Sequence, residues 1–129
     1  MPRPASPQPT EVELQILNAL WELGPSTVRQ IHNELGKHKE TNYSTTVKML
    51  SVMLDKQLVR RDDSVRPQIF RAAVTRQTAQ KKMLKGLIQK VYEGSTKSLV
   101  MQALSNHKAS AEDLAEIRHL LDQLEGETK

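Results

Sequence analysis

Short polar side chains and one lysine gather between residues 42 and 52, in a pattern suited to binding a polyanion. Hydroxyl groups in the first turn of a helix allow a phosphate to approach closely, and the helix dipole favours its charge. Lys48 can reach a phosphate or a guanine edge, and Met49 and Val52 suit thymine methyl groups. We predict that Thr45, Lys48 and Met49 read bases. The full set of predicted DNA contacts in this segment is Asn42, Tyr43, Ser44, Thr45, Thr46, Lys48, Met49 and Val52.

Arginines follow in a predicted hairpin. Residues 58–61 and 68–71 have the composition of two short strands, and residues 62–67 between them supply turn chemistry with a proline at the edge. Such a hairpin can touch a DNA backbone or minor groove. Asp62 and Asp63 offer a competing role, since they can neutralise the neighbouring arginines in a solvated turn. The predicted contacts from the hairpin are Arg60, Arg61, Arg66 and Arg71.

The side chains that catalysis or metal binding would need are absent or scattered. The chain has no cysteine, which excludes disulfides, thiolate metal sites and a cysteine nucleophile. No Gly-rich loop or nucleophile elbow occurs, and no two histidines are spaced i, i+4. The histidines are His32, His38, His107 and His119. We therefore predict no enzymatic activity, no metal and no cofactor.

Two helices are predicted ahead of the polar segment. Thr10 with Glu13 forms a capping box at the start of the first helix, which carries a broad apolar face. Thr27 with Gln30 forms a second capping box. A glycine stops each helix. These helices supply most of the apolar surface for a core.

The polar segment itself is predicted to open a third helix, capped at Asn42 and closing at Lys56. At 100° per residue, Val47, Leu50 and Leu54 fall within about 60° of one another, so we expect this stripe to face the core. A capped third helix followed by an arginine-bearing hairpin is the layout that winged-helix proteins use against DNA.

From Thr75 the helical period returns, and three amphipathic helices are predicted over residues 75–125. Three short helices do not make a core by themselves, and a leucine stripe on a terminal helix commonly pairs with a second copy of the chain. We predict a homodimer; the alternative is a monomeric helical layer. The predicted interface residues are Leu84, Leu87, Ile88, Val91, Leu99, Val100, Leu104, Leu114, Ile117, Leu120, Leu121 and Leu124.

The predicted fold is mainly α, with an N-terminal winged helix-turn-helix domain, a small β hairpin wing and a C-terminal three-helix dimerisation domain. The chain is predicted to divide into four segments: a disordered Pro-rich arm at residues 1–9, the winged-helix domain at 10–74, the dimerisation domain at 75–125 and a tail at 126–129. Neither a membrane span nor a signal peptide is evident, so a cytoplasmic protein without membrane insertion is expected.

Charge is distributed unevenly along the chain. Residues 75–109 carry seven Lys and Arg against one acidic residue, whereas residues 110–129 carry two against six. The two blocks can pair within or between chains, while part of the basic surface faces a polyanion. An ordinary solvated helix face is the simpler interpretation of the same charges.

These segments together resemble the penicillinase repressor family of winged-helix regulators, which includes repressors of β-lactamase expression and of copper-responsive operons. The resemblance runs from about Thr10 to Glu125. It implies a homodimer whose third helices enter the major groove at two half-sites of a pseudo-palindromic double-stranded DNA operator, and it makes a membrane sensor protease acting on the dimerisation domain a candidate partner. The segments that carry it are residues 13–17, 20–21, 27–31, 43–50, 56–61, 70–72 and 99–104.

Three departures limit what this resemblance implies. Penicillin-responsive members are cleaved at an Asn-Phe bond, and the matching positions here are Gln102 and Ala103, which argues against cleavage there. Copper-responsive members carry paired cysteines that this chain lacks. Gln57 stands where many relatives have a glycine that eases the exit from the third helix.

Two alternatives to a repressor share the same surface. A winged-helix module could use its third helix to hold a protein partner, which Met49 and Val52 permit. A DNA-binding activator would have the same fold and the same site, and would differ only in where its operator lies.

Overall fold

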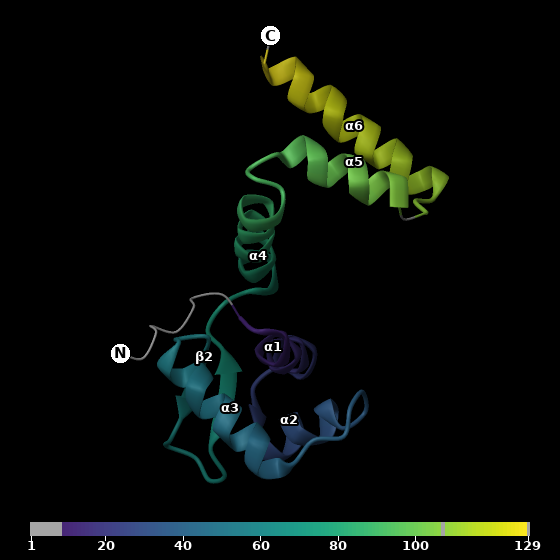
Figure 1. Cartoon of the computed structure of the whole chain (residues 1–129). Helices are drawn as coiled ribbons and strands as arrows, with labels where there is room; N and C mark the ends of the chain where they lie inside the picture. The colour runs from purple at the N-terminus through teal and green to yellow at the C-terminus, as the bar shows by residue number, and fades with distance from the viewer. Residues whose placement is uncertain (1–8, 107, 129) are drawn as a thin grey trace. The chain divides into compact units, whose positions relative to one another are not determined.

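The computed structural model describes residues 9–106 and 108–128. In this part of the chain it is mainly helical with one small antiparallel sheet, which confirms the predicted fold class (Figure 1). A first compact unit ends at Lys85 and a second begins at Gly86. The elements are α1 (Glu11–Leu23), β1 (Ser26–Thr27), α2 (Val28–Leu35), α3 (Tyr43–Asp55), β2 (Val59–Asp62), β3 (Ile69–Ala72), α4 (Arg76–Val91), α5 (Thr96–Asn106) and α6 (Ala111–Thr128).

Both predicted capping boxes are present. The Thr10 N–H donates to Glu13 Oε1 at 2.8 Å, and the Glu13 N–H donates to Thr10 Oγ1 at 3.2 Å. Thr27 and Gln30 exchange the same two bonds at 2.9 and 3.2 Å. Asn42 occupies the N-cap position of α3, but its side chain makes no capping hydrogen bond. The predicted N-cap position at Asn42 is therefore confirmed, although the cap lacks a hydrogen bond from its side chain.

Apolar side chains from α1, α2, α3 and the sheet form the core of the first unit. Ile16, Leu17 and Leu20 of α1 are buried against Ile31 of α2. The other buried members are Leu50, Met53, Leu58, Val59 and Phe70. The indole N–H of Trp21 donates to the Val74 carbonyl at 2.9 Å, which ties α1 to the chain leaving the sheet.

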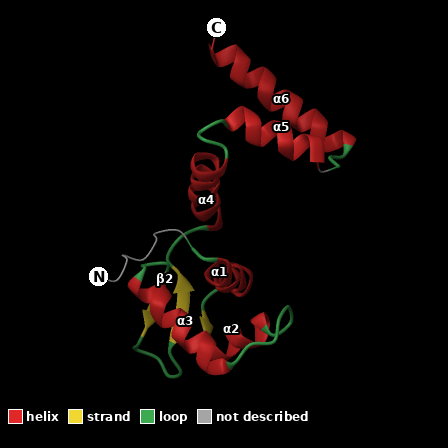
Figure 2. Ribbon diagram, in the orientation of Figure 1, coloured by secondary structure: helices red, strands yellow, loops and turns green. Residues whose placement is uncertain are grey.

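The sheet contains one strand more than the sequence predicts. Its order is β1-β3-β2, and both pairings are antiparallel. Figure 2 draws the strands in yellow. The predicted hairpin is confirmed as β2 and β3. The two-residue β1 is added through the pairs Ser26 with Phe70 and Thr27 with Ile69. Two residues carry no period-2 pattern of their own, so only pairing with a distant strand defines them.

The face of α3 turned to the core differs from the predicted one. Thr46, Leu50 and Met53 are the buried residues, whereas Val47 is 44% exposed and Leu54 is half-buried. The predicted stripe is therefore correct at Leu50 and wrong at Val47. The helix is rotated so that a threonine takes the place expected for a valine.

The exit from α3 requires an unusual backbone conformation. Gln57 has φ of 62°, in the left-handed region that favours glycine. The Leu58 N–H donates to the Met53 carbonyl at 2.9 Å, and the Gln57 N–H donates to the Leu54 carbonyl at 3.1 Å. This pattern ends the helix and directs the chain into β2. Gln57 thus adopts the backbone conformation that the glycine implied by the family resemblance would favour.

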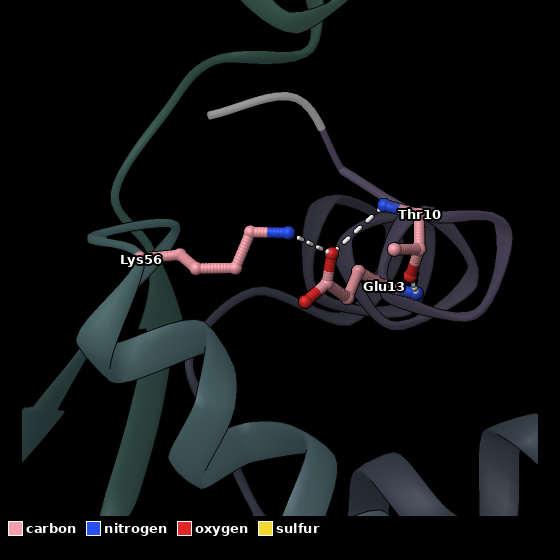
Figure 3. Close-up of polar contacts among 3 residues, drawn as sticks. All are labelled: Thr10, Glu13 and Lys56. Atoms are coloured by element: carbon pink, nitrogen blue, oxygen red, sulfur yellow. Dashed lines mark hydrogen bonds and ion pairs between the residues drawn. The ribbon is translucent and has the colours of Figure 1, made fainter. Parts of the chain in front are cut away.

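A buried ion pair joins the start of α1 to the end of α3. Lys56 Nζ lies 2.6 Å from Glu13 Oε1, and the side chains are only 6% and 1% exposed (Figure 3). Burial raises the pKa of the Glu13 carboxyl, but the hydrogen bonds from Lys56 and Thr10 and the charge of Lys56 hold that pKa below its ordinary value. The carboxylate that completes the capping box is therefore also a tertiary contact.

The second unit exposes apolar side chains. No residue of α5 or α6 is buried. α6 continues to Thr128, so residues 126–128 of the predicted tail are helical. His107 and most of the predicted arm, residues 1–8, lie outside the described residues. Within the described residues, no helix is both long and apolar enough to cross a membrane.

Candidate nucleic-acid interface

The exposed face of α3 is centred on small polar residues and one lysine. At 100° per residue, Ser44, Lys48 and Ser51 fall within about 60° of one another, opposite the buried face. All three are exposed. Tyr43 and Val47 border this group on one side, and Thr45 and Val52 border it on the other; all four are exposed. A face of this kind can enter a major groove, because its short side chains let Lys48 reach base edges or phosphates.

Two predicted contacts do not lie on this exposed face. Thr46 is 1% exposed, and its hydroxyl oxygen lies 2.9 Å from Nδ1 of His32 on α2. Met49 is half-buried and packs against the core. The prediction that the Thr46 side chain is available to a duplex is wrong, because it joins α2 to α3. Val47, which was predicted to face the core, is exposed beside this face of α3 instead.

The wing places two arginines directly opposite each other. Arg60 of β2 is paired with Arg71 of β3, and both are exposed. Like charges facing each other across an antiparallel pair are destabilising. A bound phosphate would relieve this repulsion, so the pair is suited to an anionic partner.

The tip of the wing partly neutralises its own charge. Arg61 Nε lies 2.7 Å from Asp63 Oδ1, and Arg66 Nη1 donates to the Asp63 carbonyl at 3.4 Å. The alternative in which the aspartates neutralise neighbouring arginines therefore applies to Arg61, which pairs with Asp63. The Ser64 hydroxyl and N–H both donate to Asp62, and these bonds, with the nearby charge of Arg71, hold the pKa of Asp62 below its ordinary value. Arg60 and Arg71 are exposed and take part in none of the ion pairs among the described residues.

Three residues of this surface escaped prediction from the sequence. Val47 and Ser51 were missed because Thr46 was taken as a polar surface residue, which shifted the expected core face of α3. Arg29 on α2 lies against Tyr43, with its guanidinium carbon 4.3 Å from the ring centroid. A helical wheel of α3 placing Thr46 with Leu50 and Met53 would have exposed Val47.

A metal site on this surface would require several polar or charged side chains to converge on one ion. Within residues 9–106 and 108–128, no group of three His, Asp or Glu side chains is placed to hold a metal ion. The arrangement consists of exposed cations, hydroxyls and small apolar groups on a helix and a hairpin. Such groups bind a polyanion and read base edges.

Comparison with known proteins identifies relatives. The pattern of the family described as penicillinase repressor matches residues 9–123. A penicillinase repressor from Staphylococcus aureus is 22% identical over 112 residues, which is 87% of this chain and 89% of the relative. A solved MarR family transcriptional regulator from Silicibacter pomeroyi DSS has a TM-score of 0.43 and 20% identity, and the match covers 91% of this chain and 69% of that chain.

The family match covers most of the chain. The match extends from the residue before the α1 capping box into α6, so it includes both compact units. It confirms the suspected resemblance and the prediction that the chain is not an enzyme. The protein belongs to the penicillinase repressor family of transcriptional regulators.

Proposed function

We propose that the protein is a repressor that binds a pseudo-palindromic promoter operator as a homodimer and blocks transcription by occupying it. The observation that carries this proposal is the exposed face of α3, with Lys48 at its centre and Ser44 and Ser51 beside it. The facing Arg60 and Arg71 add a cationic wing to the same unit. Membership of the family supports the same function.

Exposed apolar side chains of α4 and α6 support the dimer. Leu84, Leu87 and Val91 of α4 and Leu120, Leu121 and Leu124 of α6 are each more than 40% exposed in the single chain. Such a concentration of large apolar side chains is unusual on a monomer surface and typical of an interface. A two-fold dimer would bury the stripes and present two α3 helices to two half-sites. We include residues 75–125 as the dimerisation domain in this proposal.

The proposal is tested by binding to the DNA upstream of the protein's own gene. Fluorescence anisotropy of a labelled duplex is measured across a salt series, with a scrambled duplex as competitor. We expect sequence-selective binding. The logarithm of the association constant should fall by about 0.9 per logarithmic unit of salt concentration for each phosphate contacted. Binding that ignores both salt and sequence would contradict the proposal and favour a protein partner on the α3 face.

Lys48→Ala is expected to weaken operator binding by about 1 to 3 kcal/mol, with relaxed preference at one base pair, because Lys48 lies at the centre of the exposed α3 face. The measurement is anisotropy against duplexes that vary each base pair singly. Equal weakening for all sequences would assign Lys48 to a phosphate instead.

The matched control is Lys37→Ala. Lys37 is exposed and already pairs with Glu34 at 2.9 Å. Removing it changes the net charge equally but takes nothing from the α3 face. Loss of affinity equal to that of Lys48→Ala would show that only net charge matters, which would contradict a specific role for Lys48.

A further inference from the structure

We propose that Arg29 of α2 is a DNA-contacting residue, held by the Tyr43 ring so that its guanidinium binds a backbone phosphate beside the bases that α3 reads. This inference rests on the proposed function and adds a residue to it. It assigns a role to α2, which the sequence marked only as a core helix.

The geometry around Tyr43 is specific. The Arg29 guanidinium lies over the ring at 4.3 Å from the centroid, and the His32 ring meets its edge at 5.4 Å with an interplanar angle of 80°. Arg29 and His32 are one turn apart on α2, so the same side of that helix holds Tyr43 from two directions. His32 is itself fixed by Thr46 of α3 at 2.9 Å.

These contacts place a cation at the edge of the recognition surface. Tyr43 is the first residue of α3 and is 39% exposed. In helix-turn-helix proteins the N-terminal residues of the recognition helix contact base edges, and the preceding helix crosses the backbone. A guanidinium stacked on the first residue of α3 therefore lies where a phosphate flanks the bases being read.

The guanidinium is available to an outside anion. Arg29 is exposed, and none of the ion pairs among the described residues involves it. Stacking on an aromatic face leaves the N–H donors in the guanidinium plane open, and that planar fork matches a phosphate in two-point contact. Stacking also restricts the arginine before binding, which reduces the conformational entropy lost when the phosphate is bound.

The chain contains a matched arginine for comparison. Arg76 lies over Trp21 at 5.6 Å, but its guanidinium is 3.8 Å from Glu22 and it is remote in sequence from α3. Both arginines are stacked on an aromatic ring of the first unit. Among the described residues, only Arg29 combines stacking on the first residue of α3 with the absence of an ion pair.

The test compares Arg29→Ala, Arg29→Lys and Arg76→Ala in the full-length protein. The probes are a labelled duplex from the protein's own upstream region and a random duplex of equal length. Arg29→Ala is expected to weaken binding to both duplexes on the order of tenfold, and to reduce the salt slope by about 0.9 per protomer. Arg29→Lys should keep the slope yet bind more weakly than wild type, because lysine lacks the planar fork. Arg76→Ala should match wild type.

A neutral methylphosphonate, moved one position at a time along the duplex, then identifies the contacted phosphate. At that position neutralisation should weaken wild type but leave Arg29→Ala unaffected. If the wild type binds the upstream duplex selectively and Arg29→Ala binds it as tightly as the wild type or Arg76→Ala does, this inference is overturned. The repressor proposal would then remain intact. Failure of the wild type itself to bind the upstream duplex selectively would overturn both.

Discussion

Glu13→Ala is expected to lower the free energy of unfolding by about 3 to 5 kcal/mol, since it removes the carboxylate from a buried ammonium group. Glu13 and Lys56 lie 2.6 Å apart with almost no exposed side-chain surface. The same substitution removes the acceptor for the Thr10 N–H at the start of α1. Chemical denaturation followed by circular dichroism measures the loss.

The matched control is Glu22→Ala, on the same helix. Glu22 pairs with Arg76 at 3.8 Å, and both side chains are more than half exposed, so its removal should change stability by less than about 1 kcal/mol. A double variant, Glu13→Leu with Lys56→Met, replaces both charges by apolar groups and should recover most of the loss. Equal effects of Glu13→Ala and Glu22→Ala would contradict a buried pair.

Stability should also depend on pH through Glu13. Its pKa in the folded chain is lower than in the unfolded chain, so the folded state holds the proton less tightly. The stabilisation is fully present above the unfolded value, about 4.3 for glutamate, and is lost as pH falls through the lower folded pKa. Glu13→Gln should flatten this part of the stability curve, and an unchanged curve would contradict the assignment.

Leu120→Glu is expected to convert the proposed dimer to monomers and to weaken operator binding by about 10²- to 10⁴-fold, because a monomer loses the gain from engaging two half-sites together. Leu120 is 53% exposed in the single chain, so the charge should be tolerated within the α6 helix itself. Sedimentation velocity measures the assembly, and anisotropy measures the binding.

His119→Glu is the control for this substitution. At 100° per residue, His119 falls on the side of α6 away from the stripe formed by Leu120, Leu121 and Leu124. The control should remain dimeric and bind normally. A dimer that persists in Leu120→Glu would remove the α6 stripe from the proposed interface.

The sequence by itself determined the features that depend on neighbouring residues. The capping boxes Thr10 with Glu13 and Thr27 with Gln30 were predictable because each partner lies three positions away. The helix closing near Lys56 and the two strands of the wing were predictable from apolar period and turn composition. The left-handed conformation at Gln57 fits the glycine that the family resemblance implies at this position.

Tertiary structure decided the features that depend on residues far apart in the sequence. β1 is a strand only because Ser26 and Thr27 pair with β3. The orientation of α3 depends on His32, whose ring nitrogen lets the buried Thr46 hydroxyl find a partner, and this turns Val47 outward. The ion pair of Glu13 with Lys56 and the stacking of Arg29 on Tyr43 likewise join different helices, so neither follows from a local pattern. A local pattern records which residues are apolar, but a buried polar group is tolerated only where packing supplies its partner, and that partner is set by the fold.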